Sequence, residues 1–225
     1  PLLPLYHQAM ARQAGIELPA ALLNIGGVAN ITWLGEEENT VLAFDTGPGN
    51  ALLNDWTQMH IGRPYDEGGM LARQGTIDQA LLVQWLDHSY FLRKPPKSLD
   101  RDAWTTEGLA RLSAADGAAT LTAFTIKAIV KALDHLPAPP KAWYVTGGGR
   151  HNRVMMEGLA ARLGVPVKPV EDMGWDGDAV EAEGFAYLAV RSLKNMPLSL
   201  PETTGVPKPQ TGGRLFRAEK QSISA

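Results

Sequence analysis

Short apolar runs separated by turn residues mark the first part of the chain. A helical pattern around Tyr6–Gln13 precedes them, and Gly26-Gly27 and the acidic segment Gly35-Glu36-Glu37-Glu38-Asn39 lie between them. Short runs bounded by such turn signals are typical of strands that pair with their neighbours along the chain. The pattern therefore predicts an antiparallel meander of three strands, at Ala20–Ile25, Asn30–Leu34 and Thr40–Phe44.

The middle of the chain has a helical period. A helix is expected to open near Asn50, a good N-cap residue, with Leu52, Leu53 and Trp56 at its apolar positions. From about Gly68 to Leu136 the spacing is again helical, broken at Lys94-Pro95-Pro96-Lys97-Ser98, because two prolines forbid helix. We interpret residues 66–138 as an inserted helical subdomain.

Strand and helix patterns alternate after this insertion. A strand at Ala142–Thr146 leads through a glycine turn into a helix at Asn152–Leu163, and a strand at Val165–Val170 leads into a helix at Asp178–Leu193. Such alternation predicts parallel strands covered by helices. The fold class is thus α/β, a ribonuclease-H-like half-domain with a mixed sheet flanked by helices. Residues 195–225, rich in proline, are expected to form an irregular tail.

Composition narrows the class of protein. The chain is 44% hydrophobic and 20% charged with a formal net charge of −3, so it has no basic surplus for nucleic acid. No apolar window is long enough for a membrane span, and no leader is visible, so we expect a cytoplasmic protein. It has no cysteine, which excludes disulfides, thiolate zinc sites and a cysteine nucleophile. The chain begins at Pro1 without a methionine, as expected of a piece of something longer.

The segment Phe44–Asn50 is the sharpest candidate site. Gly47 and Gly49 let the backbone approach a ligand closely, and a helix N-terminus presents N–H groups to a phosphate. Asp45, at the end of the strand, is a candidate Mg²⁺ ligand or a general base. The alternative is structural, with Asp45 in an Asx turn and Asn50 as a helix cap.

Two further turns have the same character. Gly147-Gly148-Gly149 exceeds the needs of a tight turn, so either a ligand lies against it or it forms a simple strand-to-helix corner. It matches neither the Walker nor the dinucleotide pattern. Beyond it, Asp178 and Glu181 fit a capping box, but Glu181 also shares a helix face with Phe185 and Leu188.

A carboxylate on an apolar face needs a partner, and a sugar hydroxyl would serve. Glu181, with Asp176 behind it, is therefore a candidate sugar contact. Five of the six tryptophans suit a core, whereas Trp175 lies in a glycine-flanked loop. Lys97 and Arg101 are either solvated or in contact with phosphate. No histidine has metal-ligand spacing and no Gly-x-Ser-x-Gly elbow occurs, which disfavours metal and serine hydrolases.

Taken in order, seven segments resemble one known family. They are Leu23–Asn30, Phe44–Asn50, Tyr65–Gly69, Pro95–Ser98, Ala119–Phe124, Gly147–Gly149 with Asn152, and Asp176–Ala182. The chain is similar in them to the anhydro-N-acetylmuramic acid kinase family of the actin-like, sugar-kinase and heat-shock ATPase superfamily. After Lys97-Ser98 the family usually continues Thr-Gly-Arg-Glu, whereas this chain has Leu99–Asp102, so the role of that loop stays open.

The resemblance implies an activity and a role for each motif. ATP and water open the 1,6-anhydro bridge of anhydro-N-acetylmuramic acid and phosphorylate O6, giving N-acetylmuramate 6-phosphate in cell-wall recycling. Asp45 is expected to be the general base on the attacking water. Thr46, Gly47, Gly49 and Asn50 would form a phosphate loop, and Gly147, Gly148, Gly149 and Asn152 would border the adenosine. ATP and Mg²⁺ are the implied cofactors, and a homodimer the implied assembly.

The resemblance also implies that something is missing. The family's first phosphate loop and its N-terminal half-domain have no counterpart here, so this chain alone is expected to be folded but inactive. Three alternatives stay open: a non-catalytic sugar or nucleotide sensor, another small-molecule phosphotransferase of the same fold, and an actin-like filament protein.

Overall fold

A computed structural model describes residues 1–37 and 40–216. Glu38 and Asn39 of the predicted acidic turn, and residues 217–225 of the predicted tail, lie outside the described residues. The strands are β1 (Ala20–Ile25), β2 (Val28–Leu34), β3 (Val41–Pro48), β4 (Ala142–Thr146) and β5 (Val167–Pro169). The α-helices are α1 (Pro4–Ala14), α2 (Ala51–Ile61), α3 (Gln79–Leu86), α4 (Ala114–Lys131), α5 (Arg153–Leu163), α6 (Val180–Leu193) and α7 (Pro201–Thr204).

The five strands form one mixed sheet in the order β3-β2-β1-β4-β5. β1, β2 and β3 form the predicted antiparallel meander, and β4 and β5 extend the sheet parallel to β1. The predicted α/β fold with a mixed sheet flanked by helices is confirmed. Since β3 runs in the same direction as β1, the carboxyl ends of β1, β3 and β4 meet at one edge, where open α/β sheets bind ligands.

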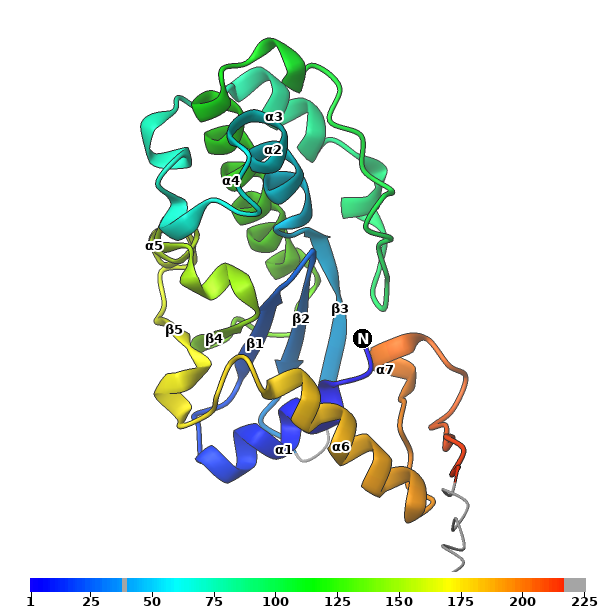
Figure 1. Cartoon of the computed structure of the whole chain (residues 1–225). Helices are drawn as coiled ribbons and strands as arrows, with labels where there is room; N and C mark the ends of the chain where they lie inside the picture. Colours follow the sequence, from blue (N-terminus) through cyan, green and yellow to red (C-terminus); the bar gives the residue numbers. More distant parts are fainter. Residues whose placement is uncertain (38–39, 217–225) are drawn as a thin grey trace, which may run out of the picture.

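Each face of the sheet has its own core. On one face, Leu23, Ile31 and Phe44 pack with Phe124 of α4 and Met155 of α5. On the other face, α1 and α6 lie side by side over the sheet (Figure 1). The alternation of strand side chains produces this division, because successive residues point to opposite faces.

Residues 66–138 are largely helical, as their spacing predicted. α3, α4 and five short 3₁₀ helices occupy this range, and Figure 1 shows them at the far end of the molecule from α1 and α6. Its division from the rest as a subdomain stays a prediction. Among the described residues, no helix combines the length and apolar character needed to cross a bilayer.

Candidate active site

A row of polar side chains crosses the sheet near the ligand-binding edge. Asp45 of β3 is in register with Asn30 of β2, Asn30 with Asn24 of β1, and Asn24 with Thr146 of β4. Side chains at paired positions lie on the same face of a sheet, here the face that α1 and α6 cover. The row therefore places the predicted base Asp45 on the same face as the β4 end that carries the glycine turn.

Asp45 is half-buried and held by its neighbours. Its Oδ2 accepts a hydrogen bond of 2.8 Å from the backbone N–H of Leu99, and its carbonyl accepts one of 2.6 Å from the Tyr90 hydroxyl. Burial raises the pKa of its carboxyl, and the Leu99 N–H opposes that shift. Within the described residues, the Asp45 side chain bonds to Leu99, far along the chain, and forms no Asx turn, so its structural alternative receives no support.

Lys97 is neither solvated nor exposed to a ligand at the surface. The residue is only 5% exposed, and its Nζ donates to the carbonyls of Tyr90 and Phe91 at 3.1 and 3.5 Å. Burial, followed by the charges of Arg93 and Lys131, lowers the pKa of Lys97 to about 8. Arg101, in contrast, pairs with Asp55 at the surface, as a solvated loop residue would.

The turn from Thr46 to Asn50 differs from the prediction. The backbone N–H groups of Gly49, Asn50 and Ala51 donate to the carbonyls of Gly26 and Gly27, at 2.7–3.2 Å. The expectation that this helix N-terminus presents unpaired N–H groups to a phosphate is wrong for these three residues. A second turn, between β1 and β2, already satisfies them.

The side chains of the same turn are also engaged. Thr46 is buried and donates to the carbonyl of Ala29, and Asn50 uses its side-chain amide to donate to the carbonyl of Ile25 at 2.8 Å. Asn50 precedes α2 as predicted but makes no side-chain cap. Of the four predicted phosphate-binding residues, Asn50 lines the larger cavity described below.

The three consecutive glycines have different reasons to be glycine. A Cβ at Gly147 would lie 2.3 Å from Asn24 Oδ1, and one at Gly149 would lie 2.4 Å from two side-chain carbons of Ile25. These two glycines allow the turn to pack directly on the end of β1. A Cβ at Gly148 would meet nothing closer than 3.8 Å. Packing therefore does not explain why position 148 is glycine.

The larger cavity lies on one side of this turn. Its volume is about 850 Å³, within the range of ligand sites. Gly148 and Asn152 line it together with Asn50, and so does a segment that sequence reasoning did not assign to the site, Tyr65–Gly68. Asn152 also caps α5, accepting from the N–H groups of Val154 and Met155. The exposed Tyr65 ring and the asparagine amides offer a flat ligand both stacking and hydrogen bonds.

A smaller cavity lies on the other side of the turn. It measures about 380 Å³ beneath α1 and α6, and the predicted sugar contact Glu181 lines it. Asn24, Asn30 and Thr146 of the polar row face it, as does Gly147. Asp176 is exposed and does not line it, whereas Asp178 does. The glycine turn thus separates two cavities, with Gly147 at one and Gly148 at the other.

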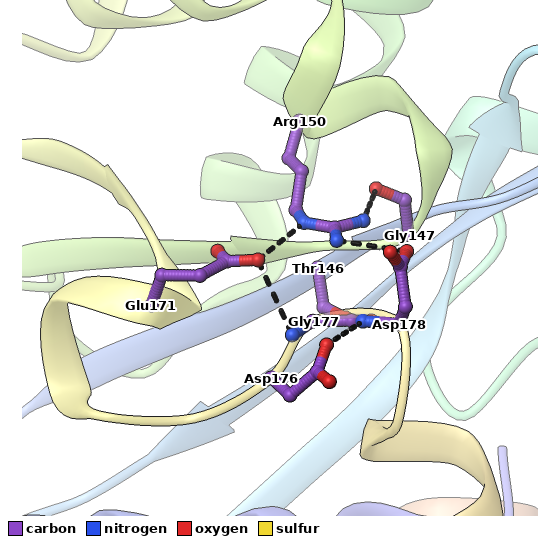
Figure 2. A network of polar contacts seen from close by, with 7 residues as sticks. All are labelled: Thr146, Gly147, Arg150, Glu171, Asp176, Gly177 and Asp178. Atoms are coloured by element: carbon purple, nitrogen blue, oxygen red, sulfur yellow. Dashed lines mark hydrogen bonds and ion pairs between the residues drawn. The ribbon is translucent and has the colours of Figure 1, made fainter.

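A buried arginine holds this turn to the loop before α6 (Figure 2). Arg150 contacts Glu171 at 2.9 Å, Asp178 at 2.8 Å and the carbonyl of Gly147 at 3.0 Å. Its side chain is 3% exposed. The Gly177 N–H also donates to Glu171, and Thr146 donates to the Gly177 carbonyl. The floor of the smaller cavity is therefore cross-linked by one guanidinium, which sequence patterns did not reveal.

The predicted capping box at Asp178 is wrong. α6 begins at Val180, its N-cap residue Ala179 makes no side-chain cap, and the carboxylate of Asp178 contacts Arg150 instead. The predicted apolar face is wrong in part, because Phe185 is 53% exposed while Leu188 is buried. Trp175 packs edge-on against Tyr6 at 5.9 Å, away from both cavity linings.

We predict that replacing Arg150 with methionine lowers the free energy of unfolding by about 2 kcal/mol, because three hydrogen bonds to a buried charged group are lost. The melting temperature should fall by roughly 4–8 °C. The matched control is Arg101→Met, since Arg101 forms a surface ion pair and should shift stability by under about 1 kcal/mol. Equal melting temperatures for the two variants would show that the Arg150 network contributes no more to stability than a surface ion pair.

Comparisons of the sequence with known proteins agree on one family. The sequence model of the family described as anhydro-N-acetylmuramic acid kinase matches residues 1–218. A protein of that name from Rhizorhabdus wittichii is 55% identical over 217 residues, which are 96% of this chain and 59% of that protein. Another from Rhodospirillum rubrum is 54% identical over 218 residues, 97% of this chain and 58% of that protein. The chain thus spans about three fifths of the length of the curated relatives that it matches.

One matching solved structure is much less similar in sequence. The (R)-2-hydroxyglutaryl-CoA dehydratase component A of Acidaminococcus fermentans has 15% sequence identity and a TM-score of 0.49, covering 83% of this chain and 67% of that one. A likeness of this size carries no information about activity.

Proposed function

The chain belongs to the anhydro-N-acetylmuramic acid kinase family, and from that premise we propose that it supplies the Asp45 half of an ATP-dependent active site. The reaction opens the 1,6-anhydro bridge of anhydro-N-acetylmuramic acid and phosphorylates O6, giving N-acetylmuramate 6-phosphate and ADP. We place this reaction in the recycling of peptidoglycan in the cytoplasm, where ATP is available. The observation that carries the proposal is the pair of cavities on either side of the glycine turn.

The larger cavity suits the adenosine. It has room for a nucleoside, and its lining combines an aromatic ring, amides and the cations Arg73 and Arg153. The phosphates would then extend across Gly148 and Asn50 toward the smaller cavity. Because the N–H groups of Gly49–Ala51 are already bonded, we propose that the phosphates are held mainly from elsewhere, with the Asn50 amide at their edge.

The smaller cavity suits the sugar. Asn24, Asn30 and Thr146 offer neutral hydrogen-bonding groups, and Glu181 offers a carboxylate for a hydroxyl. Asp45 lies one strand beyond Asn30 on the same face, on the order of 5 Å away by the usual strand spacing. The ring carbon that water attacks would thus sit between Asp45 and the phosphates.

The chemistry follows from this placement. Asp45 accepts a proton from water, whose oxygen bonds to C1 while the C1–O6 bond breaks. O6 attacks the γ-phosphorus and ADP leaves, so phosphoryl transfer replaces the proton that captures the leaving oxygen in an inverting glycosidase. The raised pKa of Asp45 favours this role, because a stronger base removes the proton more readily.

Mg²⁺ fits the site as a companion of ATP. The described residues contain no group of three His, Cys, Asp or Glu side chains that would hold a metal alone. Mg²⁺ is commonly held by one or two carboxylates and the substrate's phosphates, where it neutralises phosphate charge. We propose that phosphate oxygens and water hold Mg²⁺ here, and that Asp45, the candidate ligand from the sequence, keeps its carboxylate for the proton of the attacking water.

The proposal is tested by measuring ADP release in the presence of the anhydro sugar and ATP. The complete gene product should turn over with both substrates present and not with ATP alone. The 225-residue chain should fold and remain inactive, because catalysis in a cleft needs groups from both sides. A sensor would bind the sugar without releasing ADP, and turnover by the 225-residue chain alone would refute the expectation that it is inactive.

Homodimer formation stays a prediction that light scattering can check.

We predict that Gly148→Ala raises the KM for ATP about tenfold without loss of stability. The added methyl group meets no protein atom within 3.4 Å, but it projects beside Asn50 where the nucleotide would lie. A loss of roughly 1.4 kcal/mol of binding free energy corresponds to this change. Gly212→Ala, equally unobstructed and far from the cavity, is the control. An unchanged KM for ATP would remove Gly148 from the nucleotide site.

A further inference from the structure

We propose that His7 is a sugar-contact residue, whose Nε2 forms a hydrogen bond with a hydroxyl of the ligand in the smaller cavity. The inference deepens the proposed function and rests on it for the identity of the sugar. Neither the sequence motifs nor the polar row of the sheet includes His7, which enters the cavity from α1.

The first observation is an unpartnered nitrogen. His7 is 2% exposed, and its Nε2 has no hydrogen-bond partner within the described residues. A buried polar atom without a partner costs free energy, and most such atoms in proteins have one. Nδ1 of the same ring is satisfied, at 2.8 Å from Thr32 Oγ1 of β2, and this contact fixes the orientation of the ring.

The second observation is where the ring lies. His7 lines the 380 Å³ cavity together with Asn24, Asn30, Thr146 and Glu181. The cavity thus combines amides, a hydroxyl, an imidazole and a carboxylate around one space. These are groups that bind a polyhydroxylated molecule, which presents donors and acceptors on several sides.

The charge of the ring agrees with a hydroxyl partner. Burial is the main cause that lowers the pKa of His7 to about 4, so the imidazole is neutral at pH 7. A neutral imidazole has one donor and one acceptor nitrogen. If the Thr32 hydroxyl donates to Nδ1, Nε2 donates to the sugar; in the other tautomer Nε2 accepts. A hydroxyl satisfies both cases, whereas a phosphate would favour a protonated ring.

Two substitutions separate a sugar contact from a structural role. In His7→Asn, the side-chain amide can replace Nδ1 toward Thr32 but does not reach the position of Nε2. In His7→Gln, the longer amide can reach the position of Nε2 but loses the Thr32 contact. If His7 contacts the sugar, Asn should raise the KM for the sugar about five- to tenfold and Gln should raise it less.

The measurement uses the complete gene product, with both KM values and the melting temperature recorded for each variant. The KM for ATP should not change. A structural role predicts the opposite order, with Asn near the unmodified protein and Gln impaired in stability and in both KM values; that order, or equal KM values for the sugar, would overturn the proposal.

A measurement of sugar binding by NMR distinguishes this inference from the proposed function. We would follow the imidazole ¹⁵N resonances of His7 during titration with 1,6-anhydro-N-acetylmuramic acid in the absence of ATP. A shift of Nε2 with the sugar supports the contact even if no turnover occurs, in which case only the kinase function fails. Turnover without a shift of Nε2 would overturn the role of His7 and leave the function intact, and neither signal would overturn both.

Discussion

Replacing Asp45 with asparagine is expected to lower kcat about a thousandfold in the complete gene product. Asparagine has nearly the same shape and can accept the hydrogen bond from Leu99 N–H, but it cannot take a proton from water. General-base catalysis contributes about 10²–10⁴-fold to enzyme rates. The other members of the polar row are two asparagines and a threonine, which cannot replace Asp45 as a base. Initial rates of ADP release with saturating sugar and ATP give the ratio.

Stability and binding provide the control for this variant. Because the pKa of Asp45 is raised in the folded protein, the folded state binds the proton more tightly than the unfolded state. Its contribution to stability therefore grows as pH falls through the carboxyl range and is unfavourable at neutral pH. Asp45→Asn should melt at or above the temperature of the unmodified protein at pH 7, with sugar affinity retained. A variant with near-normal kcat would contradict the role of Asp45.

Replacing Gly49 with alanine is expected to destabilise the fold by about 3 kcal/mol, seen as a fall of roughly 6–12 °C in melting temperature. The added Cβ would lie 2.3 Å from the carbonyl oxygen of Gly26 and 3.0 Å from the Ala29 nitrogen. Both are backbone atoms that cannot move without breaking the hydrogen bonds between the two turns. Asn50 should move with the turn, so the KM for ATP should rise as well.

Gly27→Ala is the matched control for Gly49→Ala. Gly27 belongs to the opposing turn, and its Cβ would meet only the Ala51 side chain, at 3.7 Å. Its effect should stay within about 0.5 kcal/mol. If Gly49→Ala were as stable as Gly27→Ala, the close packing of the two turns would not be a determinant of the site.

The fold could be predicted where local pattern and tertiary pairing agree. β1 has the predicted bounds, since its apolar run is buried on both faces. β2 and β3 extend further than predicted, because Val28 pairs with Pro48 and Ala29 with Gly47. In a sequence, glycine and proline indicate the end of a strand. Only the cross-strand register shows that the pairing of β2 with β3 continues through Gly47 and Pro48.

The candidate site was less predictable than the fold. The glycine turns and Glu181 could be found because their residue types are unusual at those positions. Arg150 and His7 could not, since the side chains that they contact lie more than twenty residues away and only packing brings them together. The burial of Lys97 could not be predicted from its residue type. Lysine is almost never buried, so the sequence predicted a solvated or phosphate-binding side chain.

The most direct test of the proposed reaction is to run it with the complete gene product in ¹⁸O-labelled water. If Asp45 activates water against the anomeric carbon, one ¹⁸O atom will appear in the C1 hydroxyl of the sugar phosphate, and the phosphate group will carry none. Unlabelled C1, or label in released phosphate, would contradict the account, because water would then have attacked phosphorus or taken no part.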